Sequence, residues 1–93
     1  MIQDVFCKII KGELRADVVW QDEDFLVIND IHPQAPIHVL IITKKHYEAL
    51  HDFNEKDAPL MGKALLVAEK VAKQLGVHEK GYRLIINEGE HGG

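Results

Sequence analysis

The sequence predicts one domain in which a three-stranded antiparallel meander is combined with a short N-terminal helix and a long helix. Three patterns lead to this prediction. First, residues 18–20 and 25–28, which have high β propensity, flank a polar turn. Second, an apolar run covers residues 37–43. Third, apolar residues recur at helical spacing across residues 60–75. Strands that are joined by short connections usually pair in order, which gives a meander. A chain of 93 residues can bury one modest core.

The short helix is predicted near the start of the chain. Asp4 can cap it, Phe6, Ile9 and Ile10 recur at helical spacing, and Gly12 supplies a left-handed stop. A helix of this length is not stable alone in water. It is therefore expected to dock its apolar face on a larger element.

The segment between the second and third strands is rich in proline. Pro33 and Pro36 fix φ and remove two backbone donors, so the chain from Asp30 to Pro36 is expected to be an extended, directed loop. The strand that follows contains one polar side chain among its apolar residues, that of His38. Alternation places His38 on one face with Leu40 and Ile42. Its imidazole is therefore expected inside the protein or at the edge of a pocket.

The long helix is predicted to begin at Asp57, with Asn54 as the alternative, because Pro59 then lies in the first turn, where its missing N–H is harmless. Gly76 ends it. Beyond it, residues 82–87 are predicted as a fourth strand and residues 88–93 as a glycine-rich turn. The expected buried stripe of the helix consists of Leu60, Met61, Ala64, Leu65, Ala68, Val71, Ala72 and Leu75.

The bulk composition excludes several classes of protein. A formal charge of -4 and a pI near 5.8 give no general attraction to nucleic acid or to an anionic membrane. The single cysteine, Cys7, excludes an internal disulfide, and the first residues lack the features of a signal peptide. No apolar run has the length of a membrane span. The expected location is the cytoplasm.

Two features could hold parts of a ligand, and each has a simpler structural interpretation. Asp30 stands at the mouth of the proline-rich loop, where an ionised carboxylate can accept hydrogen bonds from both hydroxyls of a sugar diol. An aspartate in a turn more commonly caps its own backbone. Gly89, Gly92 and Gly93 could offer free backbone N–H groups to a phosphate, although a glycine-rich hairpin turn is the commoner meaning.

The six histidines do not predict a metal site. They stand at positions 32, 38, 46, 51, 78 and 91, and these show no HxH, HxxxH or HExxH spacing and no paired cysteine. His38 is the most informative of them, although a lone histidine within an apolar strand is more often a hydrogen-bonded core residue. Cys7, beside an aromatic residue, is expected to be a small buried apolar side chain.

Three segments taken together resemble a known family. They are FCKIIKGE at residues 6–13, NDIHPQAPIHVLIITKKH at residues 29–46, and GYRLIINEG at residues 81–89 followed by Gly92 and Gly93. In this order they closely resemble the histidine triad (HIT) family, in its Hint-type branch, over essentially the whole chain. The resemblance implies an α+β fold, usually in a two-fold dimer. It also implies binding of purine nucleotides such as AMP or GMP, and cleavage at the α-phosphate through a nucleotidyl-histidine intermediate.

The resemblance assigns roles to particular residues of this chain. His38 would support the catalytic histidines from the neighbouring strand. The nucleotide-binding set would be Phe6, Ile28 and Ile31 at the base, Asp30 at the ribose hydroxyls, and Asn87 and Gly93 near the phosphate.

The chain departs from the family pattern at the catalytic strand. The family places histidines at alternate positions just after the residues that match Gly92 and Gly93, and residues 1–93 do not contain that strand. Alternation matters because it puts the imidazoles on one face, where one attacks phosphorus and another protonates the leaving group. We therefore expect no catalytic residue within this chain, which reads as a single HIT-type domain lacking the triad strand.

A zinc site is also not expected, so that no cofactor is predicted. Zinc-binding members of the family use two cysteines near the start, and Asp4 takes the place of the first. Cys7 and His46 could be remnants of such a site, but two ligands would hold zinc poorly.

Two classes of function are compatible with these features. One is a nucleotide phosphoramidase or hydrolase of which this chain is a shortened form. The other is a nucleotide-binding module or scaffold without catalysis. Whether the chain is an enzyme is left open by the residues themselves.

Overall fold

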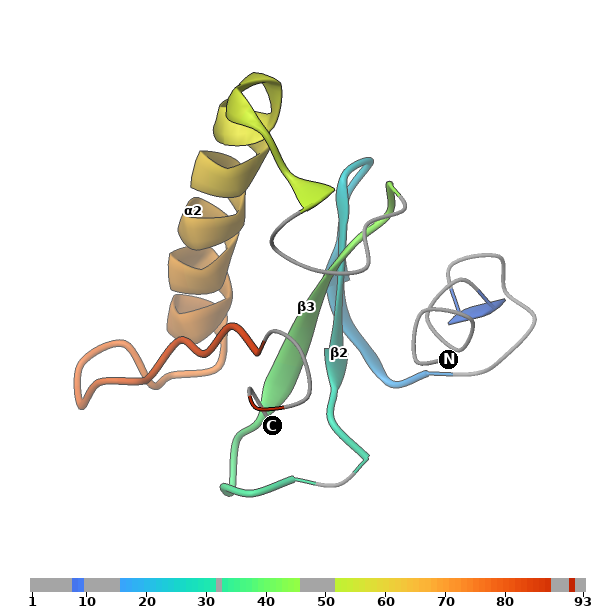
Figure 1. The fold of residues 1–93 in the computed structure, drawn as a ribbon. Helices are drawn as coiled ribbons and strands as arrows, with labels where there is room; N and C mark the ends of the chain where they lie inside the picture. The colour runs from blue at the N-terminus through green and yellow to red at the C-terminus, as the bar shows by residue number, and fades with distance from the viewer. Residues whose placement is uncertain (1–7, 10–15, 32, 46–51, 88–90, 92–93) are drawn as a thin grey trace. The chain divides into compact units, whose positions relative to one another are not determined.

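The computed structural model of the protein describes residues 8–9, 16–31, 33–45, 52–87 and 91. The chain divides into two compact units, Met1–His46 and Tyr47–Gly93. The sheet belongs to the first unit and the long helix to the second (Figure 1). Of the short helix predicted at the N-terminus, Lys8 and Ile9 are helical; its expected cap, its stop and Phe6 lie outside the described residues.

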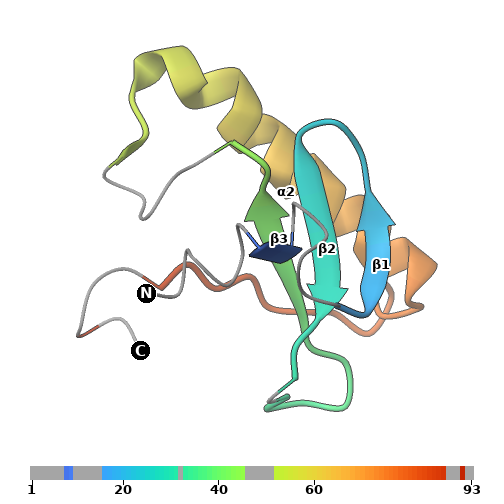
Figure 2. The ribbon, with the colours of Figure 1, turned by 90° about the vertical axis from the view of Figure 1, so that its right-hand side faces the viewer.

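The sheet of the first unit is the predicted antiparallel meander. Its strands are β1 (Val18–Gln21), β2 (Phe25–Asn29) and β3 (Val39–Thr43), in the order β1-β2-β3. β2 lies between its two sequence neighbours (Figure 2), and its residues 25–28 are buried. A strand that has a neighbour on each side and is covered on both faces usually consists of consecutive apolar residues. The residues Phe-Leu-Val-Ile at the start of β2 fit this pattern.

The turn between β1 and β2 is closed by one aspartate. Asp22 Oδ1 accepts hydrogen bonds from the backbone N–H groups of Asp24 and Phe25, both at 2.8 Å. This is the local hydrogen bonding that favours aspartate in turns. The sequence predicts a turn of four residues, 21–24, but the observed turn is residues 22–24, because Gln21 already belongs to β1.

The β2–β3 pair has a regular register that extends beyond the strand ends. Its rungs run from Phe25↔Thr43 to Asn29↔Val39 without a shift. The Asp30 N–H then donates to the carbonyl of His38 at 2.9 Å, which adds one further backbone contact. The predicted third strand, 37–43, was too long at its start, since β3 begins at residue 39. Strand boundaries commonly differ by this much, because the pairing weakens at a strand end.

The second unit contains a short 3₁₀ turn, η2 (Glu55–Asp57), followed by α2 (Ala58–Gln74). Both residues that were predicted as possible helix starts, Asn54 and Asp57, are N-cap residues in the structure. The Asn54 side chain accepts from the Lys56 N–H at 2.8 Å while Asp57 Oδ2 accepts from the Asn54 N–H at 3.0 Å, which forms a capping box around η2. Asp57 is then the N-cap residue of α2, with a proline in its first turn.

The end of α2 also agrees with the prediction, whereas its buried face differs in detail. Gly76 follows the helix with φ of +76°, in the left-handed region that favours glycine. Leu65 was predicted to be buried and is exposed. The buried residues are Val67, Ala68, Val71 and Ala72. Each helical residue turns by about 100°, so a small rotation of the buried arc moves residue 65 out and brings residue 67 in.

The predicted fourth strand is not formed. Residues 82–87 are all exposed and have no strand assignment. The residues of this segment have high β propensity, but a strand requires a partner for its backbone N–H and C=O groups, and propensity alone does not supply one.

Within the part of the chain that the structure describes, no helix is long and apolar enough to cross a membrane.

Candidate functional site

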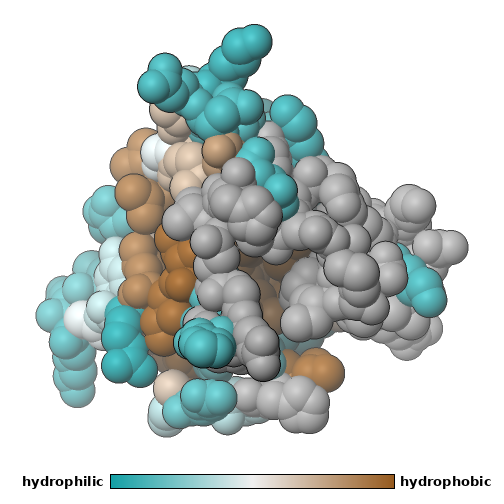
Figure 3. Space-filling view, viewed as in Figure 1, coloured by the Kyte–Doolittle hydropathy of each residue, from teal (hydrophilic) through white to brown (hydrophobic). Residues whose placement is uncertain are grey.

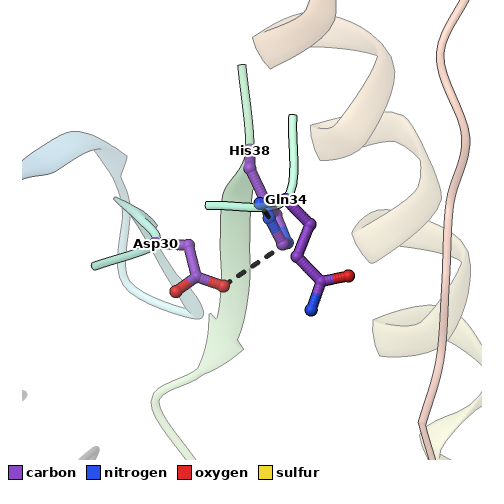
Figure 4. A network of polar contacts seen from close by, with 3 residues as sticks. All are labelled: Asp30, Gln34 and His38. Carbon is purple, nitrogen blue, oxygen red and sulfur yellow. Dashed lines mark hydrogen bonds and ion pairs between the residues drawn. The ribbon is translucent and has the colours of Figure 1, made fainter. Parts of the chain in front are cut away.

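Asp30 and His38 come together where β2 ends and β3 is about to begin. The Asp30 N–H to His38 carbonyl bond brings the two backbones together. The side chains also meet, with 3.4 Å between His38 Nε2 and Asp30 Oδ2 (Figure 4). Both side chains are partly buried, with 18% of the Asp30 side chain and 31% of the His38 side chain exposed. The two polar residues that the sequence singled out separately are therefore partners.

The other ring nitrogen of His38 is held by the proline-rich loop. The backbone N–H of Gln34 donates to His38 Nδ1 at 3.0 Å (Figure 4). A nitrogen that accepts a hydrogen bond carries no proton, so the proton of a neutral imidazole is on Nε2. That proton faces the Asp30 carboxylate. The loop therefore fixes the tautomer of His38, and the tautomer directs a donor toward Asp30.

The residues of β2 and β3 that share a face of the sheet with this pair are apolar. Residues that are opposite each other in an antiparallel pair lie on the same face, and alternate residues along a strand share that face. The rungs Leu26↔Ile42 and Ile28↔Leu40 therefore precede the Asp30 and His38 pair on one face. This arrangement confirms the predicted grouping of His38 with Leu40 and Ile42. It combines an apolar surface with a charged acceptor at its end.

The other predicted nucleotide contacts are in different situations. Ile28 is nearly enclosed, with 5% of its surface exposed, whereas Ile31 is 85% exposed and free of cover within this chain. Asn87 is exposed in the second unit. Phe6 and Gly93 lie outside the described residues, as do Gly89, Gly92, Cys7 and His46. The roles assigned to these residues stay predictions.

Three carboxylates lie close together at the tip of the β1–β2 hairpin. Within the described part of the chain, one ligand atom from each of Asp22, Glu23 and Asp24 lies within 4.8 Å of the other two. One oxygen of Asp22 already accepts two backbone hydrogen bonds in the turn. The cluster is explained by turn formation, and it does not alter the prediction that the protein needs no metal.

Sequence reasoning missed two contacts of the site. It placed Asp30 and His38 in one segment without pairing them, although counting one rung beyond Asn29↔Val39 would have done so. It also missed the contact from Gln34, which is made by the backbone. Every residue except proline carries a backbone N–H, so no residue type in the sequence could indicate which one meets His38.

Residues 11–93 match the family described as the HIT domain. The chain belongs to the HIT family. A purine nucleoside phosphoramidase of Escherichia coli strain K12 is 41% identical over 91 residues, which cover 98% of this chain and 76% of that protein. An uncharacterized HIT-like protein of Chlamydia muridarum is 45% identical over 89 residues, or 96% of this chain and 70% of that protein.

Solved structures of HIT proteins have the same fold. A HIT family hydrolase from Legionella pneumophila has a TM-score of 0.93 at 46% identity, covering 96% of this chain and 80% of that one. A histidine triad protein from Clostridium difficile has a TM-score of 0.91 at 39% identity, covering 96% of this chain and 77% of that one. These similarities confirm the predicted α+β HIT fold and the nucleotide-binding and hydrolase character of the family to which the chain belongs.

Proposed function

We propose that this HIT protein binds a purine nucleotide, such as AMP or GMP, with Asp30 holding the ribose hydroxyls. The observation that carries the proposal is the similarity to a purine nucleoside phosphoramidase along 98% of the chain. The geometry of Asp30 supports it. The carboxylate is partly exposed at the end of a row of apolar side chains on β2 and β3, and an ionised carboxylate can accept hydrogen bonds from both hydroxyls of a diol.

The base is proposed to contact apolar side chains near that carboxylate. Ile31 follows Asp30 directly and exposes most of its surface. Ile28 contributes the edge of the enclosed sheet face, and Phe6 is the third residue of the proposed base pocket. Ligand sites typically combine such apolar surface with a few polar groups that fix orientation. Asn87 and Gly93 are proposed to approach the phosphate, so base and ribose should dominate the affinity.

The reaction of the family is proposed to be hydrolysis or transfer at the nucleotide α-phosphate, of the adenosine phosphoramidate type. We propose that residues 1–93 do not complete it by themselves. Covalent catalysis at phosphorus needs an activated nucleophile and an acid for the leaving group. No two histidines of these 93 residues stand at alternate positions, and both nitrogens of His38 already face partners. Nucleotide binding is therefore the function proposed for residues 1–93.

Calorimetry and a turnover assay test the proposed function. We expect adenosine and AMP to bind the 93-residue chain with similar affinities, and 2′-deoxyadenosine to bind about 10-fold more weakly, since one charge-assisted hydrogen bond is lost. Adenosine phosphoramidate should bind without being cleaved. Equal affinities for adenosine and 2′-deoxyadenosine would contradict the role of Asp30. Steady release of ammonia, or a nucleotidyl-protein adduct, would contradict the absence of catalysis.

We also propose that the protein is a cytoplasmic homodimer. Apolar residues reach the surface over α2 (Figure 3), where Leu65 and Leu66 are 59% and 68% exposed. Leu84, Ile85 and Ile86 are exposed in the same unit. Apolar surface of this kind is typical of an interface, and a second copy of the chain would cover it by two-fold symmetry. Light scattering across a concentration series should give the mass of a dimer; a monomer at all concentrations would refute the proposal.

A further inference from the structure

We propose that His38 positions the Asp30 carboxylate for the ribose diol, and thereby sets the preference of the site for ribonucleotides. This inference rests on the proposed function, because it takes Asp30 as the group that holds the diol. It assigns to His38 a role made by contacts within residues 30–38. That role does not depend on a catalytic histidine. His38 is thus a positioning residue, which acts on the ligand through Asp30.

His38 contacts the loop at three atoms. Its carbonyl accepts from the Asp30 N–H at 2.9 Å, its Nδ1 accepts from the Gln34 N–H at 3.0 Å, and its Nε2 lies 3.4 Å from Asp30 Oδ2. The hydrogen bond from the Asp30 N–H holds the Asp30 backbone next to His38. The side-chain contact places one carboxylate oxygen of Asp30 beside the imidazole. His38 therefore contacts both the backbone and the carboxylate of Asp30.

The two ring nitrogens of His38 have different roles. Acceptance at Nδ1 obliges the neutral ring to carry its proton on Nε2. A polar N–H that lies 3.4 Å from one carboxylate oxygen favours one orientation about the terminal side-chain torsion of Asp30, which is otherwise broad. A carboxylate held in one orientation loses less entropy when it binds two hydroxyls. Ribose has two adjacent hydroxyls, so this ordering favours ribose over deoxyribose.

The two tasks of His38 can be separated by amide substitutions. In His38→Asn, the amide lies at the distance of Nδ1 from the backbone, so its oxygen can still accept from the Gln34 N–H but nothing reaches Asp30. In His38→Gln, the amide extends to the distance of Nε2, so its NH₂ can still donate to Asp30, while the acceptor for the loop is lost. His78→Asn, which changes an exposed histidine outside the loop, is the matched control.

The measurement is the ratio of the affinities for adenosine and 2′-deoxyadenosine, by calorimetry, for the wild type and the three variants. We expect His38→Asn to lower this ratio by about 3- to 10-fold, which is the effect of one typical hydrogen bond. The affinity for 2′-deoxyadenosine should fall less than that for adenosine, because 2′-deoxyadenosine offers only one hydroxyl to Asp30. His38→Gln should keep most of the preference, and His78→Asn all of it. A merely structural role of His38 would lower both affinities together and leave the ratio unchanged.

The outcomes distinguish this inference from the proposed function. A wild type without preference for ribose would contradict the role of Asp30 itself. A wild type with that preference, kept in full by a folded His38→Asn variant, would overturn the positioning role alone. If the variants do not fold, long-range ¹H–¹⁵N spectra of the wild-type imidazole decide. We expect the neutral imidazole to carry its proton on Nε2 and none on Nδ1, and the opposite tautomer would overturn the inference.

Discussion

Replacing Phe25 with alanine should leave most of the chain unfolded at physiological temperature. Phe25 is completely buried at the start of the central strand β2. Truncation of a buried phenylalanine to alanine costs roughly 3–5 kcal/mol. Single domains are stable by only about 5–15 kcal/mol, and small ones lie toward the low end of that range. The loss is therefore comparable with the whole free energy of unfolding.

Urea titration followed by circular dichroism measures this effect. Val18→Ala is the matched control, because Val18 belongs to the same hairpin and is 43% exposed. We expect the control to change the free energy of unfolding by less than about 1 kcal/mol, as for surface positions generally. A Phe25→Ala variant as stable as this control would show that residue 25 is not part of the core.

Asp30→Ala should weaken the binding of adenosine by about 10- to 100-fold, the range expected when hydrogen bonds to a charged group are lost. The affinity for 2′-deoxyadenosine should fall less, because that ligand offers only one of the two hydroxyls. The variant therefore loses the ability to discriminate between the two nucleosides. Calorimetric titration with both ligands gives the two affinities.

Asp24→Ala is the control for this second experiment. Asp24 is also a partly buried aspartate, but it precedes β2 at the hairpin tip, whereas Asp30 follows it. We expect this control to bind both nucleosides like the wild type. If Asp30→Ala also binds adenosine like the wild type, then the carboxylate belongs to the turn alone, which is the simpler interpretation that the sequence had left open.

The parts of the fold that sequence patterns predicted are those determined by local chemistry. Two apolar runs around a polar turn predicted the hairpin, and Asp22 closes that turn through its own carboxylate. Helix boundaries were also accessible, because Asn54, Asp57 and Gly76 act on backbone groups within a few residues of themselves. Features that depend only on neighbouring residues can be predicted without the positions of distant parts of the chain.

The predictions that failed concerned contacts with distant residues. Tyr82 to Asn87 has the composition of a strand, but composition does not provide a neighbouring ladder. Leu65 has the periodicity of a buried residue, but the exact rotation of α2 depends on what it packs against. The candidate site falls between these cases. Asp30 and His38 each carried a sequence signal, while their pairing depended on the register of β2 and β3.

The order of the strands along the chain links ligand binding to folding. Asp30 and His38 meet only one rung beyond Asn29↔Val39, so the site exists only in molecules whose β2–β3 ladder is complete. Closing the residues between these strands is an entropic cost of forming the sheet. Any ligand that binds the native chain alone adds RT ln(1 + [L]/Kd) to the free energy of unfolding. Occupancy of this site is therefore coupled to the stability of the whole meander, and a thermal melt of the sheet reports it.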